Sequence, residues 1–263
     1  MKMVKKLLLG LVAVATVLTL VSCDGLLNKD DDAGAITGSG KKYKVSYENE
    51  EDVAYRAYKA TKLKHAGCLV KVTFDTNDIG TSKMGIIFDL KDDDKNEGAR
   101  EFYIIGMNPR SDEKNFYVSK FTNVTDIQAS NFGTDLTENP AKEIEIVALN
   151  KANNIKYPAA DEEGKISVYV YYKALKDGSF DWKILNIDDD LAKAYNFTEG
   201  NFTSTSVITS GNTKAKAGTE YDACEEGDQP QNKIAFYAQI ASKKTLKGSW
   251  NVLGTYLEAE DAE

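Results

Sequence analysis

The sequence predicts an all-β fold, a two-sheet antiparallel β-sandwich with at most one or two short helices. Polar and apolar residues alternate in many short segments, and clusters of turn-forming residues separate these segments. No proline- or glycine-rich break divides residues 41–263, so we expect them to form one domain. No internal repeat with a period of roughly 20 to 50 residues is visible, which argues against a propeller or a solenoid.

The chain begins with a segment typical of an export leader, residues 1–22. It has a basic head with Lys2, Lys5 and Lys6, an apolar run over residues 7–21, and a small residue at its end. These are the three parts of a secretory signal. The apolar run is shorter than the roughly 20 residues that a membrane-spanning helix needs. We therefore expect the leader to be removed from the mature protein.

The end of the leader resembles the lipobox of bacterial lipoproteins, in the residues Leu20-Val21-Ser22-Cys23. The resemblance implies cleavage before Cys23, a diacylglycerol on its sulfur and a further acyl chain on its new amino group. Two or more acyl chains hold a protein stably on a bilayer. We thus expect an exported lipoprotein of the cell envelope, anchored to a membrane by its acyl chains, on either the periplasmic or the outer-surface side.

Residues 23–40 follow as a flexible tether, because glycine, aspartate and small polar residues dominate them. We interpret its acidic run, Asp30 to Asp32, as a solvated segment and not a metal site. The full chain has 33 basic and 41 acidic residues and a net charge of -8, and loss of the three leader lysines makes this -11. A nucleic-acid partner is excluded, because a protein that tracks phosphates needs a basic face.

The predicted strands, about nine to eleven in number, are segments whose apolar residues fall on one face. In chain order these residues are Val70, Val72 and Phe74; Met84, Ile86, Phe88 and Leu90; Phe102 and Ile104; Phe116 and Val118; Ile144 and Ile146; Ile166, Val168 and Val170; Ile234, Phe236, Ala238 and Ile240; and Trp250 and Val252 within residues 246–257. We assign Trp182 and Trp250 to the core.

Two segments could form helices. Residues 49–64 start with the capping residue Asn49 and three acids, which suit a helix N-terminus, but Tyr55 and Ala57 also alternate as in a strand. Both alternatives stay open there. The sequence of residues 188–195 predicts at most a short helix.

Three consecutive segments resemble the strands of concanavalin-like (laminin-G-like) jelly rolls: Gly85–Leu90, Phe102–Gly106 and Phe116–Phe121. Those domains consist of two curved antiparallel sheets and often bind glycans on the concave face or along one rim. The resemblance implies a jelly-roll sandwich and a glycan as the class of ligand, although a fold does not by itself confer a function.

Tyrosines are the candidate ligand-binding residues, because sugar rings pack their C–H faces on aromatic planes. Tyr169 and Tyr171 lie opposite the apolar face of their strand, and Tyr103 and Tyr117 alternate with buried neighbours in the same way. The alternative is that these rings are covered by a second layer of the sandwich, since aromatic residues are common in cores.

Glu143 and Glu145 offer the one hint of catalysis. They resemble a degraded form of the acid-rich strand of retaining β-glucanases, in which two carboxylates work about 5–5.5 Å apart. Val147 and Ala148 stand where the closing acid should be, so we expect no enzyme and interpret the segment as a strand with isoleucine inside and glutamate outside.

The remaining candidates are weaker. His65, the only histidine, has neither a nucleophile motif nor a recognisable set of metal ligands around it, so we expect no catalytic role. Cys68 and Cys224 are the two cysteines left to form a disulfide once Cys23 carries lipid. The acidic loop at residues 89–98 departs from a calcium-binding EF-hand, which leaves Asp92 and Asp94 as minor calcium ligands; otherwise we expect no cofactor.

The sequence therefore predicts a lipid-anchored envelope protein whose β-sandwich binds a carbohydrate or a glycoprotein without turnover. A glycan-active hydrolase that uses Glu143 and Glu145 with an acid from elsewhere is the first alternative. A structural envelope lipoprotein without a ligand is the second.

Overall fold

The computed structural model describes residues 35–61, 67–93, 99–112, 114–124, 142–149, 155–194, 207–214 and 234–256. Within these residues the all-β prediction is confirmed, because they form thirteen strands and one six-residue helix. The elements are β1 (Ile36–Ser39), β2 (Lys42–Glu48), β3 (Tyr55–Thr61), β4 (Gly67–Asp75), β5 (Lys83–Asp93), β6 (Ala99–Met107), β7 (Phe116–Val124), β8 (Lys142–Leu149), β9 (Lys165–Ala174), β10 (Phe180–Leu185), α1 (Asp189–Ala194), β11 (Val207–Asn212), β12 (Ile234–Ile240) and β13 (Thr245–Tyr256).

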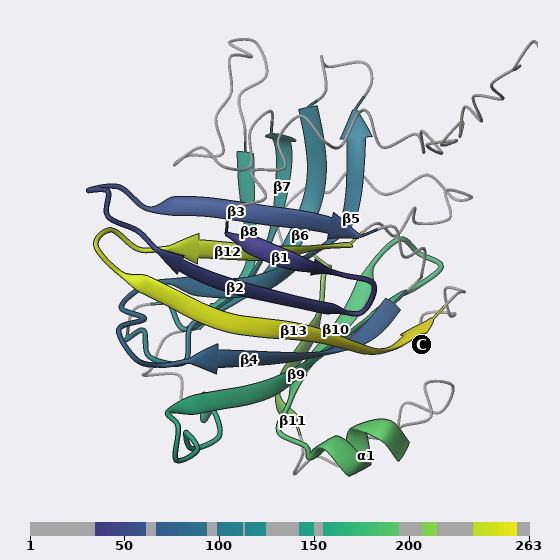
Figure 1. Ribbon diagram of the computed structural model, residues 1–263. Coiled ribbons are helices and arrows are strands. Elements are labelled where there is room, and N and C mark those ends of the chain that lie inside the picture. The colour runs from purple at the N-terminus through teal and green to yellow at the C-terminus, as the bar shows by residue number, and fades with distance from the viewer. Residues whose placement is uncertain are drawn as a thin grey trace, which may run out of the picture. The chain divides into compact units, whose positions relative to one another are not determined.

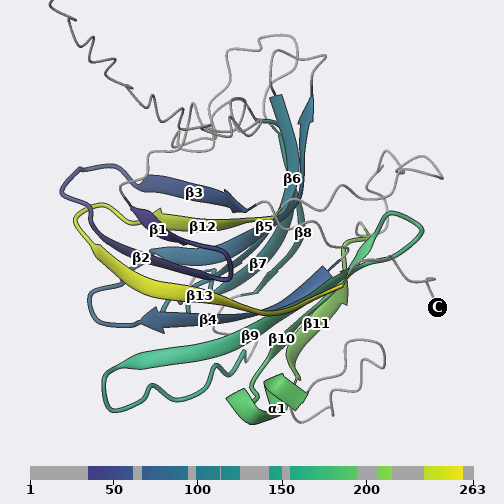
Figure 2. The ribbon, with the colours of Figure 1, turned by 45° about the vertical axis from the view of Figure 1, so that its right-hand side comes forward.

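The strands form two antiparallel sheets (Figures 1 and 2). One has seven strands in the order β1-β2-β13-β4-β9-β10-β11, and the other has six in the order β3-β12-β5-β6-β7-β8. Strands far apart in sequence are neighbours, as β13 lies between β2 and β4, and β12 between β3 and β5. The arrangement is sandwich-like and compatible with a jelly roll.

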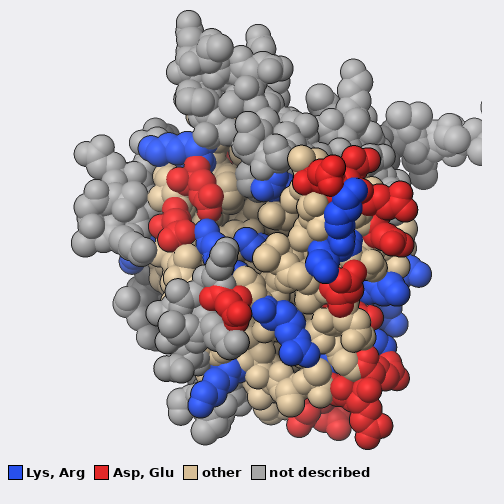
Figure 3. Space-filling view, turned by 90° about the vertical axis from the view of Figure 1, so that its left-hand side faces the viewer, with Lys and Arg blue, Asp and Glu red and all other residues tan. Residues whose placement is uncertain are grey.

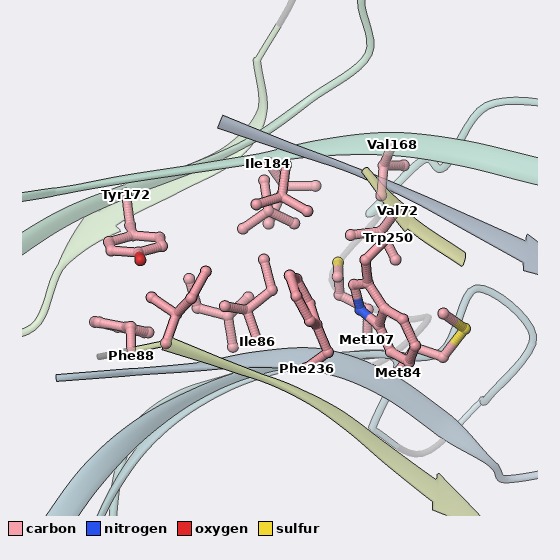
Figure 4. Close-up of a cluster of buried hydrophobic side chains, with 14 of the residues drawn as sticks. Val72, Met84, Ile86, Phe88, Met107, Val168, Tyr172, Ile184, Phe236 and Trp250 are labelled. Carbon is pink, nitrogen blue, oxygen red and sulfur yellow. The ribbon is translucent and has the colours of Figure 1, made fainter. Parts of the chain in front are cut away.

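The core lies between the inner faces of the two sheets, as the close-up in Figure 4 shows. In the seven-stranded sheet Val70 pairs with Val170 and Val72 with Val168, and all four side chains are fully buried. Trp250 crosses from this sheet to the other, where its indole Nε1 donates a hydrogen bond to the Gly85 carbonyl oxygen at 3.0 Å. The predicted core positions of Trp182 and Trp250 are confirmed.

A second apolar layer covers the outer face of the six-stranded sheet. It consists of the buried residues Tyr58, Ile87, Leu90, Phe102, Ile104, Tyr117, Phe121, Val124, Ala235 and Tyr237. Three residues that the alternation assigned to the core therefore lie on this other face: Leu90, Phe102 and Ile104. For Leu90 the cause is a bulge after Phe88, where Asp89 adopts a positive φ of 52° and the next side chain changes face.

The folded domain begins before Lys41, so the tether predicted for residues 23–40 is too long at its C-terminal end. Ile36–Ser39 is strand β1, which pairs with β2, and Ala35 and Ile36 are only 1% and 2% exposed. The glycines there make a hairpin and not a linker, because Gly38 and Gly40 have φ angles of 129° and 62° that other residues rarely adopt. The remainder of the predicted tether lies outside the described residues.

Both helix candidates are now decided. Residues 55–61 form strand β3 and residues 49–54 precede it without helix, so the strand alternative holds for the described part of 49–64. Asn49 acts as a loop anchor instead of a helix cap, since its buried amide donates to the carbonyl oxygens of Val53, Ile240 and Ala241. The short helix is confirmed as α1, capped by Asp188, whose Oδ1 accepts from the Leu191 amide at 2.6 Å.

Candidate functional site

The four candidate tyrosines do not form one platform, because they lie on three different faces. Tyr103 is inside the core, stacked on Phe88 with 5.3 Å between ring centroids. Tyr117 lies on the outer face of the six-stranded sheet, whereas Tyr169 and Tyr171 lie on the outer face of the seven-stranded sheet. All four are 5% exposed or less. None offers a solvent-exposed ring plane on which a sugar could stack.

Tyr169 is tied to helix α1. Its hydroxyl donates to the Asp189 carboxylate, which also accepts from Lys71 Nζ at 2.7 Å. The Lys71 ammonium group lies 5.8 Å from the centre of the Tyr169 ring. Burial and the bond to Asp189 raise the pKa of Tyr169. These contacts explain the residue as a support for α1, so its ring is not needed for a ligand.

Tyr117 is the centre of a group of charged side chains on the outer face of the six-stranded sheet. Its ring lies flat on Gly106, where a Cβ atom would come within 2.2 Å of the ring. The ammonium groups of Lys83 and Lys114 lie 5.0 and 4.7 Å from the ring centre. The phenol donates to that of Tyr237, and burial raises the pKa of Tyr117 well above its usual value. The ring therefore positions cations and does not face solvent.

Two carboxylates and an arginine complete this group. Lys114 Nζ lies 2.9 Å from Glu145 Oε2 and 3.7 Å from Glu143 Oε1, and Ser119 Oγ donates to Glu143 at 2.7 Å. On the other side Arg56 Nε donates to the Tyr237 hydroxyl at 3.2 Å. We call this group the Tyr117 cluster; it comprises Arg56, Lys83, Lys114, Tyr117, Glu143, Glu145 and Tyr237.

Glu143 and Glu145 lie outside on the edge strand β8, with 42% and 43% of their side chains exposed, while Ile146 is buried in the core. The predicted alternation of this strand is thus confirmed. Both acids share one lysine as their cationic partner. Both carboxylates are thus partly exposed and paired with a cation, whereas a typical catalytic acid lies in an apolar pocket.

The thiol of Cys68 is free and fully buried, and desolvation raises its pKa to about 12. The proposed bridge to Cys224 is therefore not formed in this structure; Cys224 itself lies outside the described residues. The Cys68 side chain lies in the core, and Tyr172 is its partner across the β4–β9 ladder. A buried thiol of this kind behaves as a small apolar core residue.

Most of the remaining predicted site residues lie outside the described residues. Asp92 pairs with Arg100 in the β5–β6 ladder, while Asp94, His65 and Cys23 lie outside the described residues. Across the described ranges no three His, Cys, Asp or Glu side chains come together as a metal site. Nor does that part of the chain contain a helix long and apolar enough to cross a membrane. Lipidation at Cys23 stays a prediction.

Sequence reasoning missed a pocket at one end of the sandwich, between the β4–β5 and β6–β7 loops. Its volume is about 480 Å³. Its lining includes Thr76, Asp78, Ile79, Thr81, Arg110 and Ser111. Figure 3 views the end of the sheets at which the β4–β5 connection lies, and basic and acidic side chains intermingle on this face. We call this pocket the loop-end pocket.

A buried asparagine, Asn108, joins the two loops of this pocket. Its Nδ2 donates to the carbonyl oxygens of Gly80 and Ser82, at 2.8 and 2.5 Å. Its Oδ1 accepts from the backbone amides of Arg110 and Ser111, at 2.7 and 3.0 Å. One signal could have pointed to it, since an Asn-Pro dipeptide commonly starts a turn and residues 108–109 are Asn-Pro.

Two comparisons with known proteins gave no match. No protein-family model matches the chain, and a search of curated proteins found no significant match.

Proposed function

We propose that this protein is a lipid-anchored cell-envelope lipoprotein whose β-sandwich binds a carbohydrate or glycoprotein without altering it chemically. The observation that carries the proposal is the Tyr117 cluster. It places cationic donors and carboxylate acceptors side by side on one sheet face, and sugar hydroxyls act as both donors and acceptors. The similarity to concanavalin-like jelly rolls points to the same class of ligand, because those domains bind glycans on a sheet face or along a rim.

Within the Tyr117 cluster we assign the recognition of sugar hydroxyls to Glu143 and Glu145. Their side chains are the more exposed ones, and Lys114 holds them in place from 2.9 and 3.7 Å. A positioned carboxylate accepts hydrogen bonds that are about twice as strong as neutral ones. The buried Tyr117 ring contributes by orienting Lys83 and Lys114, not by stacking on the ligand.

The hydrolase alternative uses the same two carboxylates but fits them less well. Glycoside cleavage needs one protonated and one ionised carboxyl group. Lys114 is the cationic partner of both acids, and Glu143 also accepts from Ser119 Oγ, so neither acid lies in the apolar pocket of a typical general acid. The proposal is therefore binding without turnover.

A glycan array tests the binding. The probe is residues 23–263 with Cys23→Ala, which keeps every described strand and leaves out the acyl chains. We expect selective binding that falls at least about tenfold in Glu143→Gln plus Glu145→Gln, because each change removes a charged acceptor. Glu48→Gln, an exposed acid on β2, is the matched control and should bind as the parent does. An array without any selective signal contradicts glycan binding.

A reducing-end assay on any glycan that binds separates the two classes of function. No new reducing ends should appear under binding without turnover. Release of reducing ends that stops in the double Glu→Gln variant would replace the proposal with the hydrolase.

The anchor has its own test. In the full-length chain, Cys23→Ala should move the protein from the detergent-soluble membrane fraction into the soluble fraction, because the acyl chains supply the membrane affinity. Unchanged membrane association in this variant would show that Cys23 is not the anchor.

A further inference from the structure

The loop-end pocket contains an arginine with unused hydrogen-bonding capacity. Arg110 is exposed, and within the described residues its guanidinium group has a single partner, the Thr76 hydroxyl at 3.3 Å. A guanidinium group offers five N–H donors in a planar fork that matches a carboxylate. Most of this capacity faces the pocket and the solvent, so it is open to a ligand.

The walls of the pocket are fixed in advance. Asn108 holds the backbone of Arg110 and the opposite loop at Gly80, and Thr76 is bound to the Gly164 carbonyl oxygen through both its amide and its hydroxyl. A preformed site loses less conformational entropy on binding than a mobile one. The pocket volume of about 480 Å³ lies within the range of roughly 300–1,000 Å³ typical of small-molecule sites.

Among the charged side chains that line the pocket, Arg110 is the one that suits an anionic group. Asp78, which also lines the pocket, forms an ion pair with Lys244 at 2.8 Å, so its charge is already balanced. Asp112 is exposed at the rim and takes part in an interaction of its own. Arg110, by contrast, has no carboxylate partner among the described side chains.

The other lining residues indicate which class of carboxylate ligand fits the pocket. Three hydroxyl-bearing residues, Thr76, Thr81 and Ser111, line the pocket, and Ile79 is its one branched aliphatic residue. The backbone amides of Arg110 and Ser111 are occupied by Asn108 Oδ1. They cannot form the nest of free amides that captures the C-terminal carboxylate of a peptide. A ring that carries several hydroxyls suits this lining better than a peptide does.

We propose that the loop-end pocket binds an acidic sugar, whose carboxylate pairs with Arg110 while its ring hydroxyls meet the hydroxyl and carboxylate groups of the two loops. This inference deepens the proposed function, since it names a class of glycan, but the pocket shares no residue with the Tyr117 cluster. The two assignments can therefore fail separately.

Calorimetry with trigalacturonate tests the inference on residues 23–263 with Cys23→Ala. The matched ligand is the methyl ester of the same trisaccharide, which keeps the ring hydroxyls and removes the charge. We expect the acid to bind about tenfold to a hundredfold more tightly than the ester, in keeping with a charge-assisted pair. Arg110→Gln should abolish this preference for the acid. Arg110→Lys should keep only part of the preference, because lysine lacks the planar fork of the guanidinium group.

Lys44→Gln is the control variant, since it removes one exposed positive charge from β2, away from the pocket. It should leave the affinity for trigalacturonate unchanged. Equal binding of acid and ester, no binding of either, or an unchanged affinity in Arg110→Gln would overturn the inference. If Glu143→Gln plus Glu145→Gln abolishes trigalacturonate binding while Arg110→Gln does not, the glycan binds at the Tyr117 cluster, and only the proposed function stands.

Discussion

Replacing Asn108 by alanine should destabilise the domain by about 2–6 kcal/mol. The side chain is fully buried and makes four hydrogen bonds, two to the β4–β5 loop and two within its own β6–β7 loop. The bonds to Gly80 and Arg110 are partly buried, so water can replace them at a cost of about 0.5–1.5 kcal/mol each. The Ser82 carbonyl oxygen is buried and loses its partner outright, which costs about 1–3 kcal/mol. The Ser111 amide keeps its bond to the Asn108 carbonyl oxygen and adds little.

Urea unfolding followed by tryptophan fluorescence measures this change, because Trp182 and Trp250 are both buried and report on the core. In a thermal unfolding experiment on a domain of this size, the melting temperature should fall by about 4–24 °C. Asn77→Ala is the control, since Asn77 is exposed in the same loop and should change stability by less than about 0.5 kcal/mol. If Asn108→Ala unfolds within about 0.5 kcal/mol of the parent, the idea that this side chain holds the two loops together is wrong.

Three further predictions follow from the fold. A chain that starts at Lys41 should be less stable than one that starts at Gly34 by about 2–4 kcal/mol, because it loses strand β1 with the buried Ile36. Equal denaturant midpoints of the two chains would contradict this prediction. The Cys68 thiol, with its pKa raised by burial to about 12, should resist a thiol reagent at pH 8 in the native state and react at once in urea; fast native labelling would contradict the buried position. Hydrogen bonds from Ser179, together with Lys214, lower the pKa of Asp177 to about 2. The ionised carboxylate therefore stabilises the folded state above the unfolded pKa of about 3.9, and this stability is lost as the pH falls towards 2. Asp177→Asn should remove this part of the acid sensitivity, which unfolding curves at pH 2 to 5 would show.

Alternation predicted the strands well but could not tell which face of a strand lies in the core when both faces are apolar. In β4 and β9 the outward residues are partly polar, and the inner face was assigned correctly. In β6 every residue from Phe102 to Ile105 is buried, with Tyr103 and Ile105 inside and Phe102 and Ile104 outside. A period of two is equally consistent with either choice, so only the register against β5 and β7 decides it.

Local exceptions to regular geometry were the second source of error. The bulge after Phe88 requires one residue with positive φ, and aspartate tolerates that conformation better than most side chains. Nothing in the alternation of residues 84–90 marks that position. At the N-terminal boundary the glycines of residues 38–40 look like a linker by composition, yet Ile36 next to them is the apolar residue that brings the segment into the core.

The candidate sites show the limit more clearly than the fold does. The loop-end pocket depends on the pairing of β5 with β6, in which Met84 lies opposite Met107 and brings residues 76–82 beside residues 108–112. Sequence alone gives neither this register nor the strand order. The Glu143 and Glu145 side chains were correctly expected outside, but their shared partner Lys114 lies on the loop before β7 and becomes their neighbour only when β7 pairs with β8.

Because the tyrosines are buried, we expect charged groups and not aromatic rings to hold a ligand of this protein. A sugar that stacks on aromatic rings is held by apolar contact, which responds little to ionic strength. Here the exposed groups of both candidate sites are charged, and in the Tyr117 cluster the ring lies beneath them. Charge-assisted bonds at exposed positions weaken as salt screens them, with a Debye length of about 10 Å at 0.1 M. The affinity for an acidic glycan should therefore fall several-fold between about 0.02 M and about 0.5 M NaCl, and an affinity that does not change with salt would place the ligand on an apolar surface instead.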